Sequence, residues 1–63
     1  MKADLKGALG AIHVSWKTFV HNGKRMTKDE VAKCLRYGIA KGYEHTGQLT
    51  DEDIENAIKG KKP

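Results

Sequence analysis

Residues 26–42 read MTKDEVAKCLRYGIAKG, a stretch that contains signals for both the start and the end of a helix. The Thr27 side chain can accept a hydrogen bond from the backbone N–H of Glu30, while the Glu30 carboxylate can accept one from the Thr27 N–H. Apolar residues then recur at helical spacing up to Gly42, and a glycine at such a place commonly closes a helix. The stretch therefore predicts a helix over about residues 28–41.

A second capped segment follows at residues 49–54, which read LTDEDI and repeat the arrangement with an aspartate in the fourth place of the capping box. In both segments the apolar residue before the threonine can pack on the apolar residue five positions later, as Met26 can on Val31. Any helix start benefits from such caps and from acidic residues near its positive dipole end, so the similarity indicates convergence and not an internal repeat. The segment predicts a helix over about residues 51–59.

The N-terminal third of the chain carries an apolar stripe with helical spacing. Its large apolar residues, at intervals of three or four, are Leu5, Leu9, Ile12, Trp16 and Phe19. One continuous face of this length is typical of an amphipathic helix. The stripe stops at Asn22-Gly23 and therefore predicts a long helix over about residues 3–21.

A β-hairpin is the alternative for the same segment. Apolar and polar residues also alternate between residues 12 and 20, and Asn22-Gly23 is the preferred dipeptide of a two-residue hairpin turn. The returning strand would have only Lys24, Arg25 and Met26, which is too little to hold an isolated hairpin together. We therefore favour the helix, with an α+β fold that has a short hairpin around Asn22-Gly23 as the alternative.

The expected fold is all-α, a small three-helix bundle, with a single helical domain over residues 1–60. A chain of 63 residues, of which 38% are hydrophobic, makes one domain whose core leaves a net stability of at most roughly 3–5 kcal/mol. Residues 61–63 have nothing to bury and are expected to form a disordered tail. Glycines inside the predicted helices cost helix stability and indicate points where helices approach closely. The predicted core consists of Leu5, Leu9, Ile12, Trp16, Phe19, Met26, Val31, Leu35, Leu49, Ile54 and Ile58.

No segment of the sequence resembles a signal peptide or a membrane-spanning helix. Polar and charged residues interrupt the start of the chain, and no run approaches about 18 consecutive apolar residues. Cys34 is the one cysteine, so an internal disulfide cannot form. We expect a cytoplasmic protein that does not act at a membrane.

Residue types used in catalysis and metal binding are present, but their spacing matches no known constellation. Cys34 falls on the apolar face of residues 28–41, where a cysteine behaves as an inert hydrophobe. His13 and His21 would lie two helical turns apart, about 12 Å, which is too far for one metal ion. The acidic residues from Asp51 onward lack the glycine and the glutamate of a calcium-binding loop. The sequence predicts a protein that is not an enzyme and that takes no cofactor, metal ion or small-molecule substrate.

Positive charge is concentrated in the first two thirds of the chain. Residues 1–43 contain nine Lys or Arg against three acidic residues, whereas residues 44–63 contain three against five. A basic stripe that includes an aromatic residue is the electrostatic footprint of nucleic-acid binding. The candidate contact residues are Lys24, Arg25, Lys33, Arg36, Tyr37 and Lys41.

The predicted helices do not have the spacing of a helix-turn-helix motif. About eight residues connect the second predicted helix to the third, where that motif has about three or four. The first turn of the third helix is acidic and would be repelled by phosphates. Any contact with nucleic acid would therefore be made by the basic stripe, to backbone phosphates and without much sequence readout.

We predict a small non-catalytic helical binding or regulatory module that acts through protein–protein contacts or self-association. Such a module needs exposed apolar side chains at the margins of its helical stripes. The candidates are Val14, Val20, Ile39 and Tyr43. The alternative function is that of a nucleic-acid-binding accessory protein that uses the basic stripe.

Overall fold

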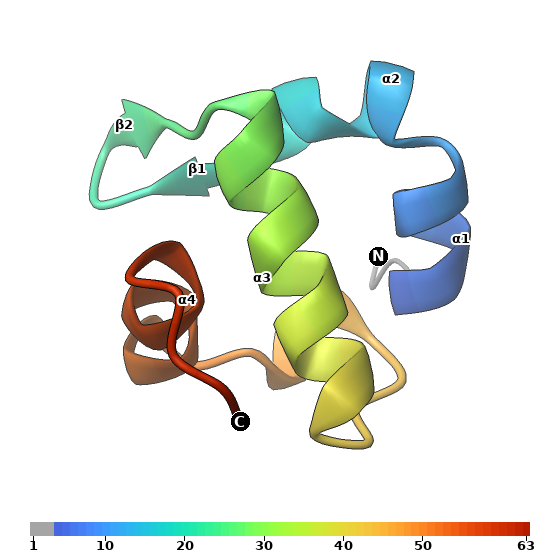
Figure 1. Cartoon of the computed structure of the whole chain (residues 1–63). Helices are drawn as coiled ribbons and strands as arrows, with labels where there is room; N and C mark the ends of the chain where they lie inside the picture. The colour runs from blue at the N-terminus through green and yellow to red at the C-terminus, as the bar shows by residue number, and fades with distance from the viewer. Residues whose placement is uncertain (1–3) are drawn as a thin grey trace.

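One long helix, α3 (Lys28–Ala40), runs through the middle of the computed structural model, which describes residues 4–63 (Figure 1). Shorter helices lie on either side of α3, and a β-hairpin lies near its N-terminal end. The other helical elements are α1 (Leu5–Gly10), α2 (Ile12–Ser15), the 3-10 helices η1 (Trp16–Thr18) and η2 (Thr46–Gln48), and α4 (Asp51–Ile58). The hairpin pairs β1 (Val20–His21) with β2 (Lys24–Arg25) in antiparallel fashion.

The two helices predicted from capping boxes are confirmed. The Glu30 N–H donates to Thr27 Oγ1 at 3.2 Å, and the Thr27 N–H donates to the Glu30 carboxylate at 2.9 Å. Thr50 and Asp53 form the same pair of bonds at the start of α4, at 3.1 and 3.0 Å. Because these signals are local in the sequence, the predicted and observed starts of both helices agree.

The prediction of one long N-terminal helix over residues 3–21 is wrong for residues 4–21, the part of it that the structure describes. The helix breaks at Ala11 (φ −108°, ψ 27°), resumes for one turn as α2, tightens into η1 and ends in an extended residue at Phe19. The Ser15 hydroxyl donates to the Ala8 carbonyl at 2.8 Å, which binds α2 back onto α1 across the break. The apolar stripe is real, but it covers three short elements and not one helix.

A hairpin follows, with its turn at Asn22-Gly23, as the alternative α+β fold predicted. Asn22 and Gly23 both have positive φ, 53° and 74°, which matches the type I′ turn that Asn-Gly favours. Met26 is almost completely buried, and its N–H donates to the Phe19 carbonyl at 3.4 Å. The short returning strand is therefore stable because its end is packed into the core and the hairpin is not isolated. The fold is mostly helical with a short antiparallel hairpin, and the expected count of three helices is too low.

The core lies where α1 and α4 pack on α3. Of the predicted core residues, four are buried and the other seven are partly buried around them. The four are Leu5, Met26, Val31 and Leu35. The buried set also contains Ala8, Cys34, Tyr37 and Ala57, which lie outside the predicted core set, although Cys34 and Ala57 were expected on the apolar faces of their helices.

Gly38 marks the closest approach between α3 and its neighbours. A Cβ atom at this position would lie 2.9 Å from Leu5 Cδ1 and 3.2 Å from Leu49 Cδ2. Leu5 is only 1% exposed, so it has little room to move away. The expected close approach is confirmed at Gly38, whereas a Cβ atom at Gly10 would meet nothing within 4 Å.

We expect Gly38→Val to lower the melting temperature by about 5–20 °C, because overpacking a filled core costs about 1–3 kcal/mol. Gly10→Ala serves as the control and should leave the melting temperature unchanged or raise it. Thermal unfolding followed by circular dichroism measures both variants. Equal melting temperatures for Gly38→Val and the wild type would contradict the close packing at Gly38.

Candidate functional site

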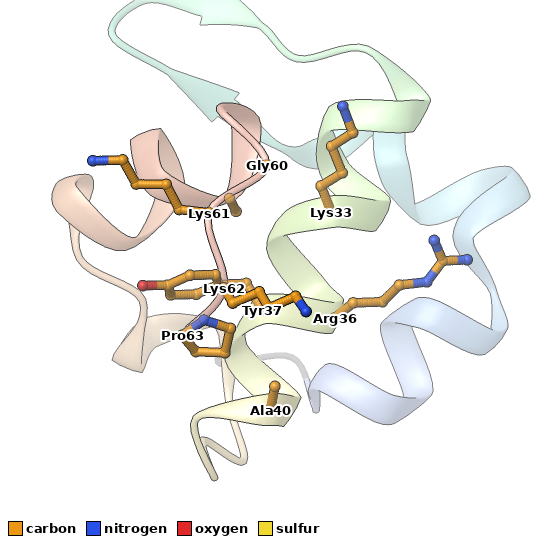
Figure 2. A pocket seen from close by; sticks show the side chains of 9 residues that line it. Lys33, Arg36, Tyr37, Ala40, Gly60, Lys61, Lys62 and Pro63 are labelled. Carbon is orange, nitrogen blue, oxygen red and sulfur yellow. The ribbon is translucent and has the colours of Figure 1, made fainter.

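A shallow groove between α3 and the segment that follows α4 gathers four basic side chains (Figure 2). Lys33 and Arg36 extend from the exposed face of α3, while Lys61 and Lys62 come from the segment after α4. We call this feature, of about 320 Å³, the basic groove. It is lined by Lys33, Arg36, Tyr37, Ala40, Ala57, Gly60, Lys61, Lys62 and Pro63.

Local structure explains why these residues meet. The four residues that α3 contributes are separated by three, one and three positions, which places them on one face of the helix. After α4 the chain turns at Gly60, and the Lys61 N–H donates to the Asn56 carbonyl at 2.9 Å. This turn sends the end of the chain back across Tyr37 (Figure 2).

Lys61 and Lys62 are absent from the residues predicted for nucleic-acid contact, because the last residues were expected to form a disordered tail. The structure places both lysines among the residues that line the groove. The disorder expected for residues 61–63 stays a prediction. A glycine directly after the last helical turn, followed by two lysines, is the signal from which their placement could have been inferred.

Lys24 and Arg25 line a second hollow of about 300 Å³, between the hairpin and the start of α3. Glu30 also lines this hollow, one helical turn before Lys33 of the basic groove, although the two hollows share no lining residue. We call the cations that line the two hollows the basic band. Its members are Lys24, Arg25, Lys33, Arg36, Lys61 and Lys62.

Few carboxylates offset the charge of the basic band. Glu30 is the one acidic residue among those that line the two hollows, and its carboxylate accepts a hydrogen bond from the Thr27 N–H. Across residues 4–63, no member of the band forms an ion pair with a carboxylate. The six positive charges are therefore available to an anionic partner.

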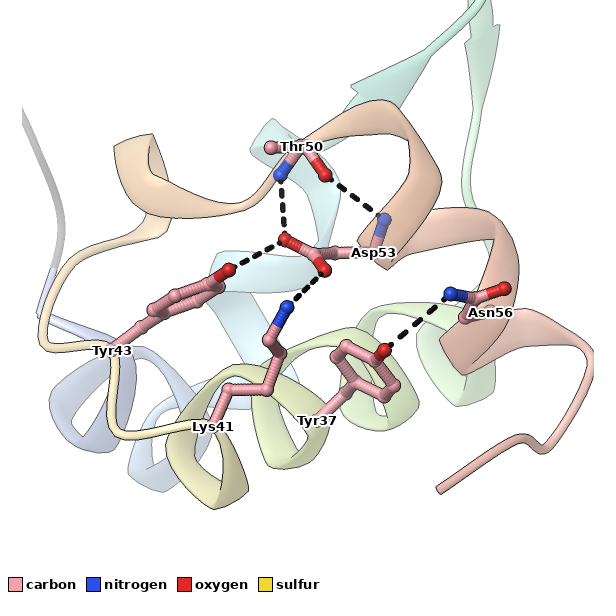
Figure 3. A network of polar contacts seen from close by, with 6 residues as sticks. All are labelled: Tyr37, Lys41, Tyr43, Thr50, Asp53 and Asn56. Atoms are coloured by element: carbon pink, nitrogen blue, oxygen red, sulfur yellow. Dashed lines mark hydrogen bonds and ion pairs between the residues drawn. The ribbon is translucent and has the colours of Figure 1, made fainter. Parts of the chain in front are cut away.

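Lys41 was predicted to belong to the basic stripe, but the structure turns it toward α4 (Figure 3). Its ammonium lies 2.9 Å from the Asp53 carboxylate, and 5.8 and 5.2 Å from the ring centres of Tyr37 and Tyr43. The hydrogen bond to Asp53 raises the pKa of Lys41 above its ordinary value of 10.5. Lys41 is thus a structural cation and does not line the basic groove.

Asp53 is the centre of a polar network that joins α3, the following loop and α4 (Figure 3). Its carboxylate accepts hydrogen bonds from the Thr50 N–H at 3.0 Å, Lys41 Nζ at 2.9 Å and the Tyr43 hydroxyl at 3.0 Å. The Asp53 residue is only 4% exposed. The bond from the Thr50 N–H, followed by those from Lys41 and Tyr43, lowers the pKa of Asp53 well below its ordinary value of 3.8.

Tyr37 was predicted as an aromatic member of the basic stripe and is buried at the bottom of the groove. Its hydroxyl accepts a hydrogen bond from Asn56 Nδ2 at 3.5 Å, which ties it to α4 (Figure 3). Only 8% of Tyr37 is exposed, so the ring forms a small part of the groove floor and does not project into solvent as the charged side chains do.

The four residues predicted for a protein interface do not form one surface. Val14 and Val20 are 58% and 61% exposed, on α2 and β1 near the N-terminal end of α3. Ile39 and Tyr43 are half-buried and line a different hollow at the other end of α3. Val20 also borders an apolar cleft of about 420 Å³, whose other lining residues are Thr18, Phe19, Met26, Cys34, Thr46, Leu49 and Ile54.

The buried thiol of Cys34 lies 3.9 Å from the Ile54 carbonyl. Burial, together with a smaller effect of the Glu30 charge, raises the pKa of Cys34 to about 11. The thiol is thus protonated at neutral pH, and a protonated thiol is a poor nucleophile.

No group of three or more His, Cys, Asp or Glu side chains in residues 4–63 is arranged to hold a metal ion. None of the helices described for this part of the chain has the length and apolar character needed to cross a membrane. Comparison with protein-family models, curated proteins and solved structures finds no match to the chain.

The Asp53 network generates a prediction about stability and pH. We expect Asp53→Asn to lower the melting temperature at neutral pH by about 5–10 °C, because the negative charge is lost and an NH2 donor replaces one of the two oxygens that accept from Lys41, Tyr43 and Thr50. Since the folded-state pKa of Asp53 is below 3.8, its contribution is complete above that pH and is lost as the pH falls further. The difference between wild type and variant should therefore shrink in acid.

Thermal unfolding across a pH series measures this difference. Glu52→Gln is the matched control, because Glu52 is exposed in the same helical turn of α4. A melting-temperature gap between wild type and Asp53→Asn that stays constant down to the acid limit of folding would contradict the role given to the Asp53 charge.

Proposed function

We propose that this protein is a non-catalytic nucleic-acid-binding module that contacts backbone phosphates through the basic band. The observation that supports the proposal is that six cations line two hollows beside α3, with Glu30 as the one acidic side chain among the lining residues. Neutralising phosphates with Lys and Arg releases condensed counterions, and this release is the main source of non-specific affinity for nucleic acid.

The arrangement favours phosphate contact over the reading of base sequence in a duplex. A helix-turn-helix reader inserts the N-terminal part of a recognition helix into the major groove. The corresponding end of α4 carries Asp51, Glu52 and Asp53, and phosphates repel such an end. The exposed cations of α3 lie along its flank, where they can follow a backbone.

Protein–protein contact or self-association is the second candidate function. It is supported by Val14 and Val20, two large apolar side chains that are more than half exposed. Val20 adjoins the apolar cleft between the hairpin, α3 and α4, which has the volume of a pocket for one apolar anchor. Sedimentation of the protein alone tests this candidate, because self-association through the valines would give a dimer that Val14→Ser with Val20→Ser abolishes.

The basic band makes a prediction about salt dependence. We expect the double variant Lys33→Gln with Arg36→Gln to bind a labelled mixed-sequence DNA strand more weakly than the wild type. Removing two phosphate contacts should reduce the slope of log affinity against log salt by about 1.4. Fluorescence anisotropy at several salt concentrations measures both the affinity and the slope.

The matched control is Lys6→Gln with Lys17→Gln, which removes the same net charge from exposed residues outside the basic band. This control should keep the wild-type slope. An equal loss of slope in both double variants would show that binding depends on overall net charge and not on the basic band. Binding that does not respond to salt would contradict the proposed contact with phosphates.

A further inference from the structure

We propose that the basic groove takes single-stranded nucleic acid, with one base lying on its apolar floor and the neighbouring phosphates held by its cationic side chains. This inference rests on the proposed function and adds to it the state of the ligand, unpaired and not duplex. It concerns the basic groove alone, because the second hollow at the hairpin has no comparable floor.

The groove combines cationic side chains with an apolar floor, and contact with a phosphate backbone would explain only the cations. Its lining includes Lys33 and Arg36 from α3 and Lys61 and Lys62 from the C-terminal segment; Arg36 and Lys61 extend outward in opposite directions (Figure 2). Its apolar floor is contributed by Ala40, Gly60 and Pro63, together with the small exposed parts of Tyr37 and Ala57. Cations attract phosphates, whereas the floor gains only from contact with an apolar group.

A nucleobase supplies the apolar group, since every base has a flat π-face that stacks on protein surfaces. In a duplex this face is covered by neighbouring base pairs. A base in a duplex therefore cannot stack on the groove floor. In a single strand the base is free to turn away from its neighbours and enter the groove. A volume of about 320 Å³ is at the small end of ligand pockets and suits one base, not a stack of several.

The floor offers little with which to distinguish one base from another. The Tyr37 hydroxyl already accepts a hydrogen bond from Asn56, and the floor groups contributed by Ala40, Ala57 and Pro63 carry no polar side-chain atom. Stacking without hydrogen-bond readout is tolerant of sequence. The groove should therefore accept any unpaired base with similar affinity.

An abasic strand separates stacking from phosphate contact, because it has the charge of a normal strand but no bases. We expect the protein to bind labelled oligothymidylate about 5- to 150-fold more tightly than an abasic strand of the same length. Both strands should show the same salt slope, since their phosphate contacts are the same. Fluorescence anisotropy measures all of these values.

Ala40→Gln provides the complementary test on the protein. Ala40 is an exposed residue at the end of α3, where glutamine is compatible with the helix, and the longer uncharged side chain fills part of the floor. We expect this variant to bind oligothymidylate as weakly as the abasic strand, with binding to the abasic strand and to duplex unchanged. Circular dichroism confirms that the variant is folded.

The outcomes distinguish the inference from the function on which it rests. Salt-dependent binding that is equally tight for oligothymidylate and the abasic strand would overturn the inference and leave phosphate binding by the basic band intact. A protein that binds neither strand nor duplex at low salt would overturn both.

Discussion

The buried carboxylate of Asp53 is the interaction on which the arrangement of the other elements depends. It binds the start of α4 through Thr50, the end of α3 through Lys41 and the intervening loop through Tyr43. A charge with so little exposure is stable only when its lone pairs are satisfied, so these partners are fixed together. The position of α4 against α3 follows, and with it the position of the segment that carries Lys61 and Lys62.

The sequence predicts the elements whose signals lie within a few residues of each other. The capping boxes of α3 and α4 depend on side chains three positions apart, and both helices begin where those boxes place them. The N-terminal segment was not predicted in the same way, because its apolar stripe continues at helical spacing through the break at Ala11. Met26 was predicted as a core residue and is buried, but its spacing did not show that this burial would also hold the short returning strand of the hairpin.

The candidate site follows the same division between local and distant information. Lys33 and Arg36 were found from their spacing on one helix, and they do lie together on the groove. Lys41 was placed on the same stripe by its helical spacing, but it faces α4 instead. Its partner there, Asp53, is twelve residues away in the chain. Lys61 and Lys62 were missed for a related reason, since the turn after α4 brings them toward a helix that is distant in sequence.

The protein therefore uses its cations in two different ways. Lys41 is paired with a buried carboxylate and held against two aromatic rings, where it supports the fold. The six cations of the basic band have no such partner among residues 4–63, and their mutual repulsion opposes folding. In a chain with a small core, an unpaired cluster of like charge contributes nothing to stability. The anionic partner that we propose would neutralise this cluster on binding, and the proposed unpaired base would cover the apolar groups of the basic groove.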